Sequence, residues 1–92
     1  MIRTFRCKDT AELYWTGRNR RFHQIAKIAC RKLDMLDAAK RLDDLRAPPS
    51  NRLEALKGDR TGYFSIRIND QWRLCFAWAE DGIHEVEIVD YH

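Results

Sequence analysis

Residues 61–79 carry the sequence TGYFSIRINDQWRLCFAWA, in which apolar and polar side chains alternate with a period of two. This alternation is typical of β-strands that have one buried face. We predict one strand over residues 61–68 and a second over residues 72–79, joined by a turn at Asn69-Asp70-Gln71. Strands joined by so short a turn pair in the antiparallel direction.

The length of this turn decides which side chains share a face, because a slip of one residue moves every side chain to the other face. A three-residue turn at 69–71 pairs Ile66 with Leu74 and gathers the large apolar side chains of both strands on one face. A two-residue turn would instead mix Ile66 with Arg73. We therefore expect the three-residue turn, and a polar opposite face that contains Arg73.

A third strand is predicted over residues 83–89, after a turn at 80–82. If this turn also has three residues, Phe76 pairs with Val86 and the polar face continues across the third strand. The three strands then form an antiparallel meander.

The N-terminal half has a different pattern. We expect a short strand over residues 2–5 and then a helix with Asp9 as its N-cap and Gly17 as its C-terminal cap. Asp37 can cap a last helix, which ends before the two prolines Pro48 and Pro49. A longer helix lies between them, with an apolar face formed by Phe22, Ile25, Ala29, Leu33 and Leu36. This order of elements predicts an α+β fold with helices packed on one face of the sheet.

The composition indicates a single domain over residues 1–92. The chain is 45% apolar and 34% charged. Its mean hydropathy is −0.61, and no apolar run approaches the ~18 residues of a membrane span. The N-terminal residues contain no apolar stretch typical of a signal peptide. We therefore expect a cytoplasmic protein without membrane contact, with a core that includes the aromatic residues Tyr14, Trp15, Trp72 and Trp78.

The cysteines and histidines point away from a metal site. Cys7, Cys30 and Cys75 are odd in number and widely spaced, and no CxxC pair is present. This usage is typical of reduced thiols, and the three histidines do not complete a zinc-ligand spacing. We expect neither a metal nor another cofactor.

Charge is unevenly distributed along the chain. All 17 Lys and Arg residues lie at or before Arg73 with nine acids, giving +8, and the last 19 residues contain five acids and no Lys or Arg, giving −5. A basic body attracts polyphosphate, so nucleic acid is the obvious candidate ligand. Acidic residues on the last strand could equally form ion pairs across the sheet.

The predicted register brings the end of the chain beside Arg73. Asp90, Tyr91 and His92 follow the last strand, so a carboxylate, a phenol and an imidazole gather near a guanidinium. Arginine can hold a phosphate and stabilise the charge of its transition state, and histidine can transfer a proton. These residue types suit phosphoester chemistry, although Arg73 could instead pair with Glu87 on the neighbouring strand.

Two further segments concentrate cations. The turn at residues 56–63 carries Lys57 and Arg60, and the loop after Gly17 carries Arg20 and Arg21. Each segment could contact a phosphate backbone or simply remain solvated.

Three ordered motifs resemble HigB toxins, which belong to the RelE superfamily of bacterial toxin–antitoxin modules. These motifs are residues 56–63 (LKGDRTGY), residues 65–76 (SIRINDQWRLCF) and the ending at residues 89–92 (VDYH). The resemblance covers essentially the whole chain and is nearest to the GraT-like branch. It implies a RelE-like fold and a ribosome-dependent endonuclease that cleaves messenger RNA at A-site codons. The RNA 2′-hydroxyl would attack the phosphate, leaving a 2′,3′-cyclic phosphate and a free 5′-hydroxyl.

The resemblance also implies residue roles. Lys57 and Arg73 would bind and stabilise the phosphate, and Asp90, Tyr91 and His92 would supply acid–base and positioning groups. Some HigB toxins have a histidine just before the Lys-Gly-Asp-Arg turn, where this chain has Glu54, so Glu54 is a further candidate catalytic residue. The cations that we expect to contact RNA are Arg20, Arg21, Arg52, Arg60 and Arg67.

The same resemblance implies a small HigA-like antitoxin with a helix-turn-helix, through which the pair would bind operator DNA. Two other functions remain open from the sequence: a ParE-like toxin that acts on gyrase, and a non-catalytic ribosome-binding or nucleic-acid-binding inhibitor.

Overall fold

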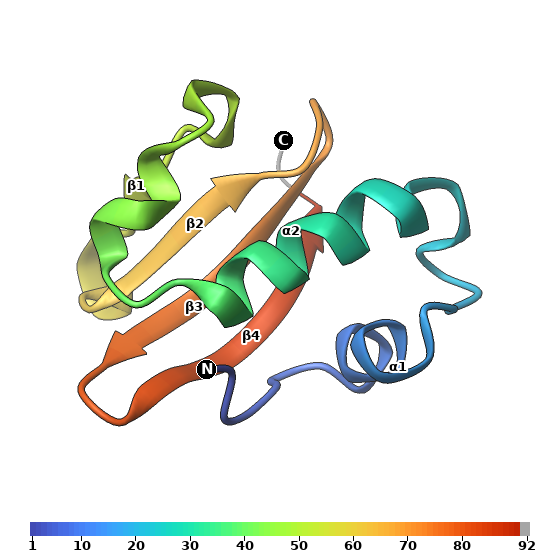
Figure 1. Ribbon diagram of the computed structural model, residues 1–92, viewed down its shortest axis with the longest axis horizontal. Helices are drawn as coiled ribbons and strands as arrows, with labels where there is room; N and C mark the ends of the chain where they lie inside the picture. Colours follow the sequence, from blue (N-terminus) through green and yellow to red (C-terminus); the bar gives the residue numbers. More distant parts are fainter. Residues whose placement is uncertain (91–92) are drawn as a thin grey trace.

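The computed structural model describes residues 1–90, which form a four-stranded antiparallel sheet with two α-helices (Figure 1). The strand order is β1-β2-β3-β4, and α2 lies across one face of the sheet (Figure 1). This architecture confirms the predicted α+β class. The main elements are α1 (Lys8–Thr16), α2 (Ala26–Ala38), β1 (Glu54–Ala55), β2 (Tyr63–Arg67), β3 (Trp72–Ala79) and β4 (Gly82–Asp90).

The β2–β3 hairpin has the predicted register. Phe64 pairs with Phe76, and Ile66 pairs with Leu74. The turn is held by Asn69, whose Oδ1 accepts hydrogen bonds from the backbone N–H groups of Gln71 and Trp72 at 2.9 and 2.8 Å. The alternation of apolar side chains is therefore sufficient to predict this part of the sheet.

The β3–β4 pairing follows the predicted register in one half of β4 only. Cys75 pairs with Glu87, but Ala77 pairs with His84, so one residue of β3 faces two residues of β4. The predicted one-to-one pairing of Phe76 with Val86 is replaced by a β-bulge, in which Phe76 faces both Glu85 and Val86. Glu85 in the bulge has a φ of 55°.

The physical reason for the bulge is the N-terminal segment. The backbone N–H of Glu85 donates to Thr4 Oγ1 at 2.8 Å, and the N–H of Val86 donates to the carbonyl of Thr4 at 3.1 Å. Successive N–H groups of a regular strand point in opposite directions, so two that bond to the same residue require a break in the alternation.

The predicted strand over residues 2–5 is wrong. Those residues form two isolated parallel bridges to β4, Ile2 with Ile83 and Phe5 with Val86. They nevertheless cover the outer edge of β4. The N–H of Ile83 donates to the Met1 carbonyl at 2.9 Å, and that of Ile88 donates to Thr10 Oγ1 in α1 at 3.0 Å. An edge covered in this way is closed to pairing with another chain.

Two predicted helix caps are wrong because their carboxylates bind elsewhere. Cys7, not Asp9, precedes α1, and Asp9 Oδ1 accepts a hydrogen bond from Asn19 Nδ2 at 3.1 Å. Asp37 lies inside α2 and accepts the N–H of Ile2 at 2.9 Å. The predicted last helix is a short 3₁₀ turn over Leu42–Arg46. Gly17 does end α1 in the left-handed region, as predicted, with a φ of 77°.

The core lies between the helices and one sheet face. All five side chains of the predicted apolar helix face are buried in this core. Three of them lie on α2, whereas Phe22 and Ile25 precede it, with Ile25 in the 3₁₀ turn over His23–Ile25. Trp15 is an exception to the aromatic prediction, because 75% of its surface is exposed. Within residues 1–90, no helix is both long enough and apolar enough to cross a membrane.

The buried side chain of Asn51 fixes the segment that connects α2 to the other face of the sheet. Asn51 is fully buried, and its Oδ1 accepts a hydrogen bond from Lys32 Nζ. Its amide donates to the carbonyls of Leu45 and Ala47 at 3.1 and 3.2 Å. This one side chain therefore ties the 3₁₀ turn over 42–46 to α2 and fixes where Arg52 emerges.

The close approach of Met1 to β4 predicts a stability difference between two glycines. At Gly82, where φ is 138°, an added Cβ would lie 2.8 Å from the Met1 carbonyl. At Gly62, where φ is 91°, it would meet nothing within 4 Å. Gly62→Ala should lower the free energy of unfolding by about 1–2 kcal/mol through backbone strain alone. Gly82→Ala should lower it further, and faster amide exchange at Ile83 should accompany the loss. Equal losses would show that Met1 does not constrain β4.

Candidate active site

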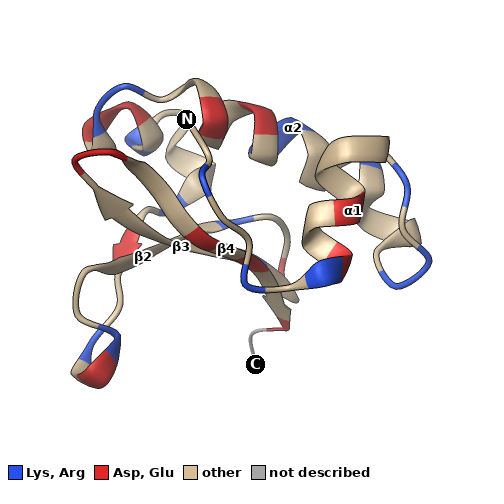
Figure 2. Ribbon diagram, turned by 90° about the horizontal axis from the view of Figure 1, so that it is seen from below, with Lys and Arg blue, Asp and Glu red and all other residues tan. Residues whose placement is uncertain are grey.

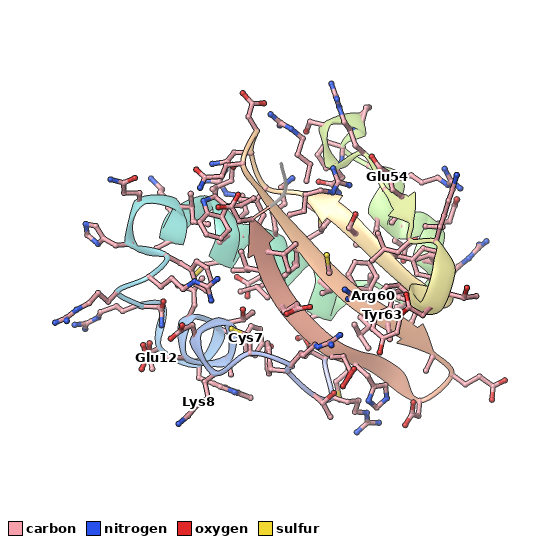
Figure 3. All side chains as sticks on the ribbon, turned by 180° about the vertical axis from the view of Figure 1, so that it is seen from behind. Cys7, Lys8, Glu12, Glu54, Arg60 and Tyr63 are labelled. Atoms are coloured by element: carbon pink, nitrogen blue, oxygen red, sulfur yellow. The ribbon has the colours of Figure 1, made fainter. Side chains whose placement is uncertain are left out.

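Most of the predicted site residues that the structure describes gather on the sheet face that the helices leave open. Residues 52–60 cross beside this face, because β1 pairs with β2 through Glu54 and Ser65. The 3₁₀ turn over Gly58–Arg60 then returns the chain to β2. Figure 3 shows Arg60 and Tyr63 lying together over the sheet and Glu54 at its margin.

Arg73 is the best-anchored cation of this face. Its Nε donates to Ser65 Oγ at 2.9 Å, and its Nη2 donates to the carbonyl of Arg52 at 2.7 Å. The same Nη2 lies 3.8 Å from Glu54 Oε1. The residue is 6% exposed. Arg73 therefore lies on the predicted polar face, but it is buried because the segment before β1 covers it.

The backbone of Arg52 is shaped to meet this guanidinium. Arg52 has a φ of 46°, and the only other non-glycine residue with a positive φ within residues 1–90 is Glu85. Such a conformation costs about 1–3 kcal/mol for a residue with a side chain. The carbonyl that accepts from Arg73 thus comes from a strained position, and the strain is offset by a charge-assisted hydrogen bond.

A small hollow of about 190 Å³ opens over Arg73. Arg52 and Glu54 line one side, and the β2–β3 turn lines the other. Arg67, which pairs with Arg73 across β2 and β3, also lines this hollow and forms an ion pair with Asp70. Three arginines and two carboxylates therefore surround a space large enough for a phosphate group.

A second hollow of about 370 Å³ lies beside it and is lined by two more of the predicted catalytic residues, Lys57 and Asp90. Lys57 and Arg60 come from the turn, Cys75 from β3 and Asp90 from the end of β4. Asp90 Oδ2 accepts a hydrogen bond from Gln71 Nε2 at 3.1 Å. Predicted residues from four separate segments of the chain therefore meet along one face.

Arg60 is held differently from Arg73. Its guanidinium lies 4.8 Å from the ring centre of Tyr63, and its Nη2 lies 3.5 Å from Glu87 Oε1. Nε and Nη2 are both buried, and within the described residues they have no hydrogen-bond partner. Glu87 also faces Arg6 at 3.9 Å. The suggested pair between Arg73 and Glu87 is therefore wrong, because Glu54 faces Arg73 and Glu87 faces Arg60.

The remaining predicted residues lie elsewhere. Arg20 and Arg21 are on the loop between α1 and α2, at the end of the sheet where β4 finishes. Figure 2 shows this loop and the turn before β2 projecting on either side of the C-terminal end of β4. Tyr91 and His92 lie outside the described residues. Their proposed roles stay predictions.

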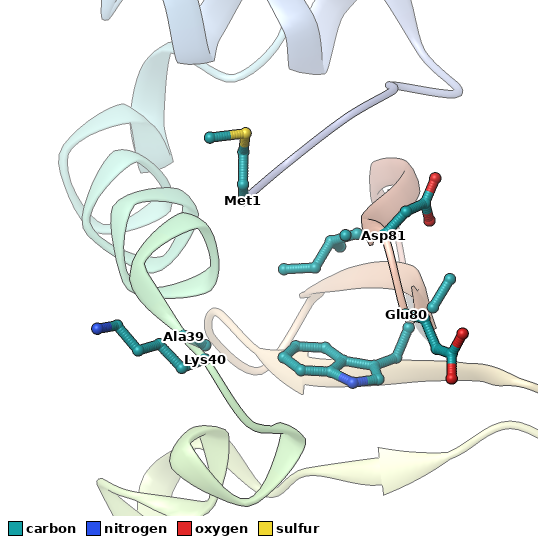
Figure 4. A pocket seen from close by; sticks show the side chains of 9 residues that line it. Met1, Ala39, Lys40, Glu80 and Asp81 are labelled. Atoms are coloured by element: carbon teal, nitrogen blue, oxygen red, sulfur yellow. The ribbon is translucent and has the colours of Figure 1, made fainter.

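A larger hollow of about 490 Å³ lies at the opposite end of the sheet (Figure 4). Met1, Lys40, Trp78 and Glu80 are among the residues that line it. No predicted site residue lies there, and its lining offers no cluster of cations for an anion. Volume alone therefore does not identify the site.

Sequence reasoning missed Ser65 as a site residue. It is fully buried, and it orients Arg73 through its hydroxyl and, at 3.3 Å, its carbonyl. The available signal was its place on the same strand face as Arg73, two residues from Arg67. No group of three His, Cys, Asp or Glu side chains within residues 1–90 is arranged to hold a metal ion.

The comparison with protein families is decisive for the identity of the chain. Residues 3–92 match the family described as RelE-like toxin of type II toxin–antitoxin system HigB. The chain belongs to this HigB family. The resemblance inferred from the three motifs is therefore confirmed, and the residues around Arg73 lie within the part of the chain that matches the HigB family.

Two curated proteins are similar to this HigB-like chain. Toxin HigB-1 of Vibrio cholerae is 50% identical over 62 residues, which cover 67% of this chain and 64% of that protein. Endoribonuclease HigB of Proteus vulgaris is 33% identical over 61 residues, which cover 66% of this chain and 65% of that protein. The chain thus spans a little under two thirds of the length of these relatives.

Two solved structures share the fold of the HigB-like chain. One is a YoeB–YefM complex from Staphylococcus aureus, with a TM-score of 0.61, 22% identity, and coverage of 100% of this chain and 98% of that one. The other is a YoeB dimer from the same organism, with a TM-score of 0.57, 24% identity, and coverage of 99% and 97%. They support the RelE-like fold.

Burial of Arg73 predicts a stability effect. Arg73→Ala should lower the free energy of unfolding by about 2–4 kcal/mol, because it removes charge-assisted hydrogen bonds and leaves buried acceptors unpaired. Arg52→Ala is the matched control, since it keeps the carbonyl that Arg73 binds and should cost about 0.5 kcal/mol or less. Urea denaturation measures both. Equal stabilities of the two variants would place Arg73 on an open surface.

Burial also predicts the reactivity of Cys75. Burial raises the pKa of the Cys75 thiol to about 11, so the nucleophilic thiolate is scarce at pH 8 and increases only as the pH approaches that value. Cys7 is partly exposed. Iodoacetamide at pH 8 should therefore alkylate Cys7 well before Cys75, as measured by peptide mass mapping. Rapid labelling of Cys75 would show that residues 56–60 do not close over the sheet.

Proposed function

We propose that the protein is an endoribonuclease toxin that cleaves messenger RNA on the ribosome. The observation that supports this function best is the row of cations along one sheet face, anchored by the buried Arg73 and adjoining carboxylates of Glu54 and Asp90. The printed name of the Proteus vulgaris relative, Endoribonuclease HigB, points to the same activity.

The proposed reaction needs no protein nucleophile. A carboxylate accepts the proton of the RNA 2′-hydroxyl, whose oxygen attacks the adjacent phosphorus. The bond from phosphorus to the 5′-oxygen breaks, and a general acid protonates that oxygen. The products are a 2′,3′-cyclic phosphate and a free 5′-hydroxyl. The charge that develops on the phosphate requires fixed positive groups, and these contribute most when they are already oriented.

Arg73 supplies the fixed positive potential in this proposal, and Lys57 supplies a mobile contact to the phosphate. Lys57 is exposed at the start of the 3₁₀ turn over Gly58–Arg60, whereas Arg73 is held by three acceptors. Glu54 stands beside Arg73, which offsets its negative charge near RNA, so Glu54 can serve as the base. Asp90, Tyr91 and His92 remain candidates for the acid and for positioning groups.

The proposed partners follow from the family. We propose a HigA-like helix-turn-helix antitoxin that neutralises the toxin and carries operator binding, and a ribosome that holds the message in the reactive geometry. Positioning of this kind can lower a barrier by roughly 7–11 kcal/mol. Here it would hold the RNA 2′-hydroxyl in line with the phosphorus that it attacks.

Mapping of message 5′ ends after induction tests the proposal. The wild type should produce new ends with a 5′-hydroxyl, matched by 2′,3′-cyclic phosphates. Asp90→Asn should reduce cleavage by about 10²–10⁴-fold if Asp90 transfers a proton. Lys57→Ala should reduce it by about 10-fold or more through loss of a phosphate contact. Lys27→Ala, an exposed cation on α2, is the control and should cleave normally.

Other outcomes would overturn the function. Growth arrest without new message ends would indicate a non-catalytic inhibitor that occupies the ribosome. DNA damage without message cleavage would indicate a gyrase toxin.

A further inference from the structure

The pocket beneath the loop after α1 is separate from the two hollows of the open sheet face. It has a volume of about 350 Å³ and lies between the loop after α1 and the β2–β3 turn. Gln71 lines this pocket, and its side-chain amide donates to Asp90, which lines the 370 Å³ hollow on the open face. The two spaces therefore meet at one hydrogen bond, at the end of the sheet.

The wall of the pocket combines flat rings with cations. Trp72 packs edge-on against Phe22, with ring centres 5.5 Å apart at 88°. The guanidinium carbon of Arg21 lies 5.0 Å from the centre of the Phe22 ring and 5.9 Å from that of Trp72. Asp9 lies 3.7 Å from the same guanidinium and helps to keep it in place.

This arrangement is suited to stacking. A guanidinium that rests on aromatic rings presents its other face to solvent, and the Arg21 side chain is about half exposed. RNA-binding proteins commonly stack unpaired bases on aromatic rings and on arginine planes. Arg20 and His23 are exposed on the same loop, where they can approach the phosphate attached to a stacked base.

We propose that this pocket binds a nucleotide that flanks the cleavage position. The base stacks on Arg21 and Trp72, and its phosphate contacts Arg20. The strand then passes over the hydrogen bond between Gln71 and Asp90 into the hollow that contains Lys57. This inference rests on the proposed function in taking single-stranded RNA as the substrate. An acidic peptide would also be attracted by the arginines, but it would make no use of the aromatic surface.

Binding of an uncleavable RNA tests the pocket apart from catalysis. The probe is a 2′-O-methyl oligouridylate 12-mer, which lacks the attacking hydroxyl, with one 4-thiouridine for photo-crosslinking. Arg20→Gln should raise Kd about threefold at 50 mM salt and reduce the salt slope by about 0.7, as expected for one lost contact to a single strand. Arg21→Gln should raise Kd by about 10-fold through lost stacking.

Arg46→Gln is the matched control, because Arg46 is an exposed arginine on the 3₁₀ turn over 42–46 that pairs with Asp43. It should bind RNA like the wild type. Crosslinked peptides of the wild type should contain residues 20–25 or 71–72, and Arg21→Gln should lose these crosslinks. Melting temperatures of all variants show whether a loss of binding is a loss of folding, and crosslink positions identify the pocket even for a less stable variant.

The outcomes separate the pocket from the proposed function. If messages are cleaved in cells but crosslinks avoid the pocket and Arg20→Gln binds normally, the flanking subsite is wrong and the function stands. If messages are not cleaved and the probe does not bind, both fail. If Arg20→Gln weakens binding of a polyglutamate peptide but not of RNA, the pocket is a protein-docking site and the inference is overturned.

Discussion

The buried guanidinium of Arg73 is the contact on which the geometry of the open face depends. A guanidinium removed from water must have its donors satisfied, or the protein loses the hydration energy without compensation. Ser65 and the carbonyl of Arg52 satisfy it, and each comes from a different part of the chain. The carbonyl of Arg52 must therefore point toward Arg73, which fixes the position of the segment before β1. The residues that follow, from Glu54 to Lys57, are positioned by this contact.

The constraint also explains why an energetically poor backbone conformation persists. Arg52 occupies the left-handed region without being a glycine. It is flanked by two anchors, the Asn51 amide in the core and the Arg73 guanidinium on the sheet. Strain of this kind persists only where surrounding contacts overdetermine the conformation, and it concentrates at functional sites.

The features that follow from the local alternation of apolar and polar residues can be predicted from the sequence. The features that depend on contacts between residues far apart in the chain mostly cannot. The β2–β3 register follows from alternation alone, because only one turn length gathers the apolar side chains. The bulge at Glu85 depends on Thr4, which lies 81 positions away, and no local pattern in β4 records it. Asp9 and Asp37 have the residue type of helix caps, but their partners Asn19 and Ile2 come from other elements.

The candidate site shows the same division. Its residue types can be predicted from the sequence, because Lys57 and Arg73 belong to the motifs and Glu54 stands just before the first motif. Their environments cannot. Arg73 is buried by the segment that leads into β1, a two-residue strand with no periodicity to detect. The pairing of Glu87 with Arg60 results from a turn that folds back over the sheet.

The open face carries two kinds of cation, one buried and one exposed to solvent. Glu87 on β4 faces two arginines that lie outside the three-strand meander, Arg60 at 3.5 Å and Arg6 at 3.9 Å. Arg73 is enclosed, while Lys57 is exposed at the margin. An enclosed cation acts through a surrounding of low polarity, where its field is weakly screened and no reorganisation is needed when charge develops. An exposed cation moves with its ligand but is screened by water and salt. In our proposal the face uses both, with Arg73 setting a fixed potential toward which the phosphate is drawn and Lys57 following the phosphate as its charge increases.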